Sequence, residues 1–159
     1  MTPAIKALEK AKAEFNIHEY NHDPAAESYG LEASEKLGVN ATQVFKTLVV
    51  MLDAKEFAVG VIPVSAMLSM KHIAKAASAK KAAMADKLDV ARISGYVLGG
   101  VSPFGQKKFL KTFVDASAQT HPSIYVSAGR RGLEVEVAPD VFKNLLRATF
   151  VDLTQEHAD

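Results

Sequence analysis

Lys46 is the side chain whose type and setting most directly suggest chemistry. It lies in the strongly apolar segment 44–50, where alternation places it on the same strand face as Val44, Leu48 and Val50. An ammonium group on such a face must either extend to water or meet an anion. A lysine at a strand edge would account for the pattern equally well. A cation at the rim of a core can also bind phosphate or stabilise developing negative charge.

A glycine-rich segment, residues 98–105, is the second candidate. Gly99 and Gly100 lack side chains, so a ligand can approach their backbone N–H groups closely. A tight turn before Pro103 would require glycines as well. The segment is therefore a weak indication of a binding loop when it is taken alone.

Residues 126–137 predict a hairpin with a basic tip. Arg130 and Arg131 lie at the turn, and guanidinium groups of this kind can hold phosphates. Ser127 precedes the turn, whereas Glu134 and Glu136 follow it on the face that we expect to point away from the core. A tip that only keeps the protein soluble is an equally good interpretation.

The chain lacks the residues of several common active sites. It has no cysteine, which excludes disulfides, thiolate nucleophiles and Cys-ligated zinc. It also has no Gly-x-Ser-x-Gly nucleophile motif, no Walker phosphate loop and no dinucleotide-binding glycine pattern. Surface or hydrogen-bonded roles are favoured over zinc binding for all of the histidines, which are His18, His22, His72, His121 and His157. We expect no metal and no other cofactor.

Charge is distributed unevenly along a chain whose net charge is only +1. Residues 71–111 carry a balance of +7, whereas residues 1–45 and 112–159 each carry −3. A local excess of this size attracts polyanions, although a solvated lysine-rich surface explains it as well. No apolar run approaches the ~18 residues of a membrane span, and the N-terminus lacks the apolar core of a secretory signal. We therefore expect a cytoplasmic protein without a membrane partner.

The elements that must position these groups form a mixed pattern. Helices are expected at 2–15, 31–37, 69–77, 86–93 and 140–147, with Thr2, Ser69, Asp86 and Asp140 as N-caps. Strands are expected at 17–20, 44–52, 57–62, 112–115, 124–127, 133–137 and 150–153, and 82–85 can form a further short one. About seven strands with five helices predict an α/β (mixed α+β) fold. We expect a single domain spanning residues 1–159, with one curved mixed sheet and flanking helices.

The strand at 44–50, the glycine loop at 96–105 and the hairpin at 127–139 together resemble the YbaK family of trans-editing deacylases. They match in order and spacing, as do the opening Thr-Pro-Ala and the strand 17–23, so the resemblance covers essentially the whole chain. It implies a hydrolase, with a lyase class kept beside it, that cleaves mischarged Cys-tRNA(Pro) and, as a second substrate, Cys-tRNA(Cys). It also implies a complex with prolyl-tRNA synthetase and no DNA partner.

The resemblance further implies a set of site residues. Lys46 would act at the ester beside the terminal adenosine, in binding or in catalysis. The residues expected to bind the substrate are Tyr20, Tyr29, Thr47, Gly99, Gly100, Ser127 and Glu134. Thr47 would face away from the site on a regular strand, so it requires a local twist. Glu134 would contact the α-ammonium, although the family usually has Asp at this position and Glu is longer by one methylene. The residues expected to hold the tRNA are Lys71, Lys80, Lys81, Lys107, Lys108, Arg130 and Arg131.

The missing nucleophile has an explanation if the substrate supplies its own. The thiol of a cysteinyl ester has a reference pKa of about 8.5, and a nearby cation would increase its thiolate fraction. Attack on its own ester carbonyl is intramolecular, which compensates in part for a strained four-membered thiolactone. An Ala- or Ser-tRNA deacylase that uses water, and a non-catalytic tRNA- or synthetase-binding module, remain the alternatives.

Overall fold

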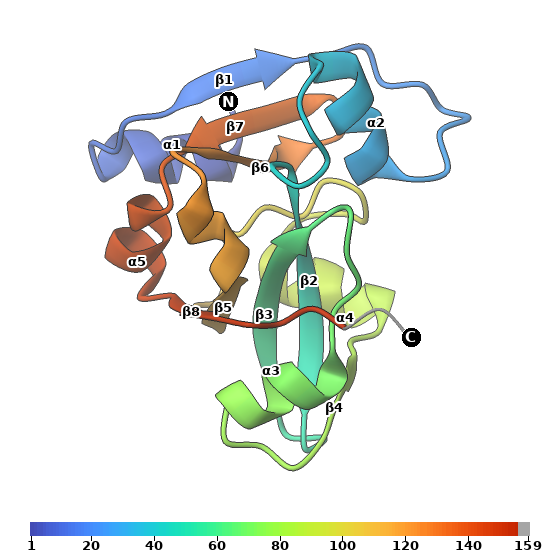
Figure 1. Ribbon diagram of the computed structural model, residues 1–159, viewed down its shortest axis with the longest axis vertical. Helices are drawn as coiled ribbons and strands as arrows, with labels where there is room; N and C mark the ends of the chain where they lie inside the picture. Colours follow the sequence, from blue (N-terminus) through green and yellow to red (C-terminus); the bar gives the residue numbers. More distant parts are fainter. Residues whose placement is uncertain (156–159) are drawn as a thin grey trace.

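An antiparallel hairpin of β2 (Phe45–Leu52) and β3 (Glu56–Pro63) forms the centre of the larger sheet (Figure 1). Its five strands have the order β4-β2-β3-β5-β8. The outer strands are β4 (Ala82–Met84), β5 (Lys111–Asp115) and β8 (Thr149–Val151). Because β3 pairs with β5 in parallel and β5 with β8 likewise, the sheet is mixed, as predicted. This computed structural model describes residues 1–155. His157 and the end of the expected 1–159 domain lie outside that range, and the single-domain interpretation stays a prediction.

A second, smaller sheet carries the basic hairpin. It has the order β1-β7-β6 and is antiparallel, with β1 (Asn16–Glu19), β6 (Ile124–Arg130) and β7 (Leu133–Val137). The α/β class is confirmed, but the strands form two sheets instead of one. An isolated parallel bridge from Val44 to Tyr125 connects them, so pairing between the sheets is limited to that point.

Five α-helices of the described chain flank the sheets: α1 (Pro3–Lys10), α2 (Tyr29–Leu37), α3 (Met70–Ala76), α4 (Lys87–Ser94) and α5 (Asp140–Leu146). A short 3-10 helix, η1 (Ala116–Thr120), follows β5. The caps at Thr2 and Ser69 are confirmed by hydrogen bonds from Ile5 N and His72 N to the side-chain hydroxyls.

Three expectations about the helices are wrong in detail. The first helix ends at Lys10, well before residue 15, because the chain turns through a left-handed Lys12. Asp86 occupies the N-cap of α4 but makes no side-chain capping bond. Asp140 is the first residue of α5, where Pro139 takes the cap position.

The core lies on both faces of the β2–β3 hairpin. One cluster fills the space between the two sheets and includes Phe45, Val61, Val126 and Phe104, all nearly inaccessible to solvent. On the other face, α3 covers a second cluster through Ile73. Alternation along β2 therefore sends side chains into two separate cores. None of the helices described is long and apolar enough to cross a membrane.

Candidate functional site

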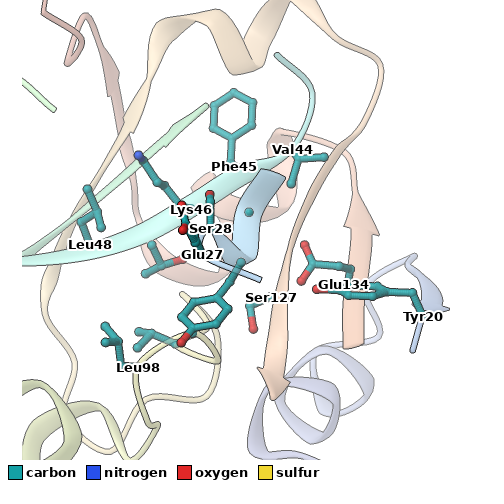
Figure 2. Close-up of a pocket in the computed structure, with 15 residues that line it drawn as sticks. Tyr20, Glu27, Ser28, Val44, Phe45, Lys46, Leu48, Leu98, Ser127 and Glu134 are labelled. Carbon is teal, nitrogen blue, oxygen red and sulfur yellow. The ribbon is translucent and has the colours of Figure 1, made fainter. Parts of the chain in front are cut away.

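A pocket of about 300 Å³ opens where β2, the start of α2, the glycine loop and the β6–β7 hairpin meet (Figure 2). It gathers seven residues that the sequence nominated for the ester and the substrate: Tyr20, Tyr29, Lys46, Thr47, Gly99, Ser127 and Glu134. They come from five separate segments of the chain. Gly100 does not line the pocket. It is buried against the backbone of Arg130, where an added Cβ would lie 2.9 Å from Cα.

Lys46 is half-buried in the pocket wall. Burial lowers the pKa of its ammonium group, because the charged form loses hydration. Within residues 1–155 it forms no ion pair. The fold therefore holds a partly desolvated cation that is available to an anionic or polarised ligand.

Thr47 also reaches the pocket, although a regular strand would turn it away. Strand β4 pairs with β2 only from Val50 to Leu52, so the first half of β2 is a free edge. The pocket extends around this edge and touches side chains of both faces. The Thr47 hydroxyl oxygen is buried and has no hydrogen-bond partner in the described part of the chain.

Glu134 departs from its expected exposed position on β7. Its side chain is only 7% accessible, and burial raises the pKa of its carboxyl group to about 8. The face of β7 opposite Leu133 forms the wall of the pocket instead of meeting solvent. Burial, with the nearby Glu134 charge, also raises the pKa of Tyr20 to about 12. Figure 2 shows Glu134 beside Tyr20, on the side of the pocket away from the Lys46 ammonium.

The rim of the pocket is held by Arg131. Its guanidinium carbon lies 4.0 Å from the centre of the Tyr29 ring, and its Nη2 donates to the Leu98 carbonyl at 3.1 Å. Gly99 has a left-handed backbone (φ +87°), and an added Cβ would lie 2.5 Å from Arg131 Nε. The glycine is therefore required here both for its backbone conformation and for space.

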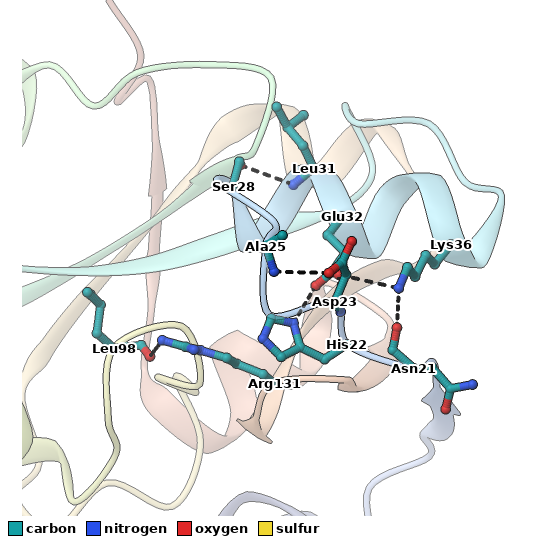
Figure 3. Close-up of polar contacts among 10 residues, drawn as sticks. All are labelled: Asn21, His22, Asp23, Ala25, Ser28, Leu31, Glu32, Lys36, Leu98 and Arg131. Atoms are coloured by element: carbon teal, nitrogen blue, oxygen red, sulfur yellow. Dashed lines mark hydrogen bonds and ion pairs between the residues drawn. The ribbon is translucent and has the colours of Figure 1, made fainter.

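A buried carboxylate supports the loop that carries Tyr20 and Tyr29 (Figure 3). Glu32 of α2 accepts hydrogen bonds from His22 Nδ1 at 2.7 Å and from the Asp23 backbone N–H at 2.6 Å, with Lys36 Nζ at 3.4 Å. Burial alone would raise the pKa of Glu32, but these partners outweigh it and lower the pKa. The preferred hydrogen-bonded role is confirmed for His22, and for His18, which bonds to Glu136 at 3.0 Å.

The residues expected to hold the tRNA fall in separate places. Arg131 lies at the pocket rim, as described, and Arg130 is exposed at the end of β6. Lys107 and Lys108 follow the glycine loop and are exposed. Their backbone N–H groups donate hydrogen bonds to carbonyl groups at the end of α4. Lys71, Lys80 and Lys81 surround a different hollow, beside α3 and β4.

Eight further residues line the pocket that the sequence did not single out: Glu27, Ser28, Gly30, Val44, Phe45, Leu48, Leu98 and Val101. Ser28 was detectable, because it precedes an expected helix and caps α2 through Leu31 N. The apolar members gave no signal that separates a pocket wall from a core.

The pocket lacks an activated nucleophile among the residues described. Its hydroxyl groups belong to Ser28, Thr47, Ser127 and the two tyrosines, and none of the histidines within residues 1–155 lines it. Ser127 Oγ accepts a hydrogen bond from Gly129 N at 3.2 Å instead of donating to a base. The site offers a half-buried cation and a buried acid, which can bind and polarise a substrate.

Comparison with known proteins gives this pocket a family. The model of the aminoacyl-tRNA editing domain matches residues 23–145. The chain belongs to this family. A relative from Enterococcus faecalis, named "Putative Cys-tRNA(Pro)/Cys-tRNA(Cys) deacylase EbsC", is 35% identical over 156 residues, covering 96% of this chain and 93% of its own.

Solved structures share the fold of this editing-domain protein. A "putative trans-editing enzyme for prolyl tRNA synthetase" superposes with a TM-score of 0.84 at 20% identity, over 98% of this chain and 99% of its own. A scaffold protein used for computational epitope grafting superposes with a TM-score of 0.85 at 21% identity. The match covers 97% of this chain and 96% of the scaffold chain. The expected family and its fold are thereby confirmed.

Proposed function

We propose that this protein is a free-standing deacylase that hydrolyses the ester of Cys-tRNA(Pro), with Cys-tRNA(Cys) as a second substrate. The observation that carries the proposal is the pocket, where Lys46 and Glu134 lie on different sides and no histidine activates the hydroxyl groups. The family match and the Enterococcus relative support the same substrate class.

The two ionisable groups suit the two ends of a cysteinyl ester. Glu134 receives the α-ammonium, whose positive charge lowers the pKa of the carboxyl group and so favours an ion pair on binding. Lys46 is placed at the ester, where its ammonium polarises the carbonyl and increases the thiolate fraction of the substrate. The Thr47 hydroxyl has no partner among residues 1–155 but is buried, so its contact with the substrate requires a local shift of β2.

The substrate's thiol supplies the missing nucleophile. The thiolate attacks the ester carbonyl, the bond between the carbonyl carbon and the ribose oxygen breaks, and the ribose oxygen takes a proton. Water then opens the thiolactone to give free cysteine. Because the overall reaction consumes one water molecule, it is a hydrolysis, and the lyase class kept beside it at the outset is wrong.

Two wider statements belong to the same proposal. The Arg131–Tyr29 pair at the rim receives the 3′ end of the tRNA, because an aromatic ring and a guanidinium group offer stacking and phosphate contacts. Prolyl-tRNA synthetase, which would produce the mischarged substrate, is the partner, and the cytoplasm is the compartment. The structural relative linked by its description to prolyl-tRNA synthetase supports this partner.

Release of cysteine from purified Cys-tRNA(Pro) tests the proposal, with Ala-tRNA(Pro) and Ser-tRNA(Pro) alongside and Lys46→Ala as the control. We expect fast loss of cysteine only, and loss of that activity in the variant. Equal hydrolysis of the alanyl or seryl ester would favour a water-activating deacylase. Intact tRNA binding without hydrolysis of any ester would favour the binding module.

A further inference from the structure

Four lysines surround one hollow at the end of the molecule away from the pocket. Lys71 and Lys75 come from α3, and Lys80 and Lys81 come from the segment that leads into β4. The hollow measures about 450 Å³, and all four side chains are exposed. Figure 1 shows α3 and β4 at the opposite end of the molecule from α2 and β7, which border the pocket.

The charge of this hollow exceeds its internal counter-charge, because Asp53 is the carboxylate bonded to the lysine loop. None of the four ammonium groups forms an ion pair among residues 1–155. Lys71 and Lys75 are four residues apart on one helix, a like-charge spacing that costs stability. An arrangement that carries such a cost without a matching internal counter-charge fits an external polyanion.

The backbone beneath the two remaining lysines is fixed. Asp53, in the β2–β3 turn, accepts hydrogen bonds from Lys80 N at 3.0 Å and from Lys81 N at 2.8 Å. These backbone N–H groups lower the pKa of the Asp53 carboxyl, so it is ionised at neutral pH. The nearby carboxylate thus serves to hold the loop, while the lysine side chains extend into solvent.

The position of the hollow relative to the pocket follows from the strands. Lys46 borders the pocket on the free part of β2, and β4 continues along that same edge, from Met84 opposite Val50 to Ala82 opposite Leu52. Lys81 directly precedes β4. Leu52 is six residue steps beyond Lys46 along β2, which is about 20 Å at ~3.4 Å per residue.

We propose that this hollow is a second tRNA site, which binds the phosphate backbone of the acceptor stem. Nucleotide spacing in duplex DNA is about 3.4 Å and spacing in RNA is of the same order, so about 20 Å corresponds to on the order of six nucleotides from the ester. That distance passes the unpaired 3′ end and reaches the first base pairs. The inference rests on the proposed function for its substrate and adds the place where the duplex docks.

The test is the double variant Lys71→Ala/Lys75→Ala, with Lys6→Ala/Lys10→Ala as a matched control. Lys6 and Lys10 are also exposed and also four residues apart on a helix, α1, so both variants remove equal charge in the same helical setting. Unchanged melting temperatures check folding. Fluorescence anisotropy measures the affinity for an acceptor-stem RNA duplex that carries the 3′ overhang but no amino acid. The same measurement at several salt concentrations gives the salt dependence. Deacylation of full Cys-tRNA(Pro) and of a cysteinyl CCA trinucleotide gives kcat/KM.

We expect the hollow variant to bind the duplex about 10-fold more weakly, with a salt slope that is smaller by about 2, whereas the control resembles wild type. The kcat/KM of the Lys71→Ala/Lys75→Ala variant should fall for Cys-tRNA(Pro) and stay unchanged for the cysteinyl trinucleotide. Equal duplex binding by both variants would overturn the inference, and so would equal losses on both substrates. A loss that appears only when the synthetase is present would also overturn it and indicate a protein partner.

The two proposals can fail separately. If wild type hydrolyses no ester but the hollow variant still loses duplex affinity, the docking site stands and the deacylase does not. If Cys-tRNA(Pro) is hydrolysed equally by both variants, the deacylase stands and the docking site does not.

Discussion

At the residue scale, Lys46 carries a charge whose burial opposes folding. The lowered pKa of its half-buried ammonium means that the folded state disfavours the charged form. We predict that Lys46→Met, which keeps an unbranched side chain, leaves the melting temperature equal or higher. Deacylation of Cys-tRNA(Pro) should fall by at least ~100-fold, as when one electrostatic donor is lost. Thermal unfolding and single-turnover rates measure the two effects, and a variant that retains wild-type activity contradicts the role of Lys46.

Glu134 gives a prediction about pH. Its pKa in the folded protein, about 8, exceeds the ordinary value of 4.5, so the folded state binds the extra proton. Its contribution to stability is complete below the unfolded-state pKa and is lost as pH rises through 8. Glu134→Gln should therefore become more stable than wild type between pH 5 and 8, by on the order of a few kcal/mol, with no further gain above that range.

Denaturant unfolding at pH 5, 7 and 9 measures this difference. A free-energy difference between Glu134→Gln and wild type that is constant across the series would show that the carboxyl is not held protonated by burial.

The sequence predicted the presence of Lys46 and Glu134 in the site but not the surroundings of Glu134. Alternation placed Lys46 on the same strand face as Val44 and Leu48, and both of these residues line the pocket with it. It placed Glu134 on the face opposite Leu133 and Val135, which we expected to be exposed. That face is buried because loop and helix segments from elsewhere in the chain form the pocket over it. Period-2 patterns identify a face of a strand, whereas what covers that face is a tertiary property.

At the element scale, the glycine loop is built around the rim. Gly99→Ala introduces a Cβ at a left-handed backbone position and 2.5 Å from Arg131 Nε, next to the Tyr29 ring. We predict a stability loss of about 1–2 kcal/mol together with a several-fold lower kcat/KM, because the Arg131–Tyr29 contact must shift. Gly38→Ala is the control, since Gly38 is also left-handed but has nothing within 4 Å of the added Cβ.

Melting curves and deacylation kinetics of the two variants separate the effects. Gly38→Ala should lose stability only. If Gly99→Ala keeps the catalytic parameters of wild type, the rim contact has no role in substrate binding.

The loop before α2 depends on Glu32. Glu32→Gln exchanges a buried carboxylate that accepts from His22 and Asp23 N for a neutral amide. We predict a loss of about 1–3 kcal/mol at neutral pH, together with a raised KM, because Tyr20 and Tyr29 flank this loop. The pKa of Glu32 in the folded protein is lower than its ordinary value of 4.5. The carboxylate therefore stabilises the fold fully above the ordinary pKa, and this stabilisation disappears as pH falls through the lowered pKa.

Chemical unfolding at pH 7 and pH 3 checks the prediction for Glu32→Gln. The stability gap should be smaller at pH 3, and a gap that widens on acidification would contradict the role of the carboxylate.

Most elements were predictable because their local signals agree with the fold. The hairpin 44–62, the cap at Ser69 and the helix stop at Gly38 all appear as expected. The division into two sheets was not predictable, because pairing between β2 and β6 is limited to one bridge at Val44. Nothing in local sequence determines which strand edges remain free, and it is the free edge of β2 that brings Thr47 to the pocket.

At the scale of the whole molecule, the pocket and the lysine hollow lie toward opposite ends of the β2–β4 edge. The pocket is small enough for the reacting end of the substrate, while the lysine hollow beside α3 and β4 lies about 20 Å along the sheet edge. A near-neutral protein can therefore still attract a polyanion, because four of its lysines surround a single hollow.

The most direct test of this account compares Cys-tRNA(Pro) with 2-aminobutyryl-tRNA(Pro), in which a methyl group replaces the thiol at nearly the same size. Single-turnover release of the amino acid is measured for both esters with wild type and Lys46→Met. We predict release of cysteine at least ~100-fold faster than of aminobutyrate, with the difference removed by the substitution. Equal rates for the two esters would contradict catalysis by the substrate's own thiol.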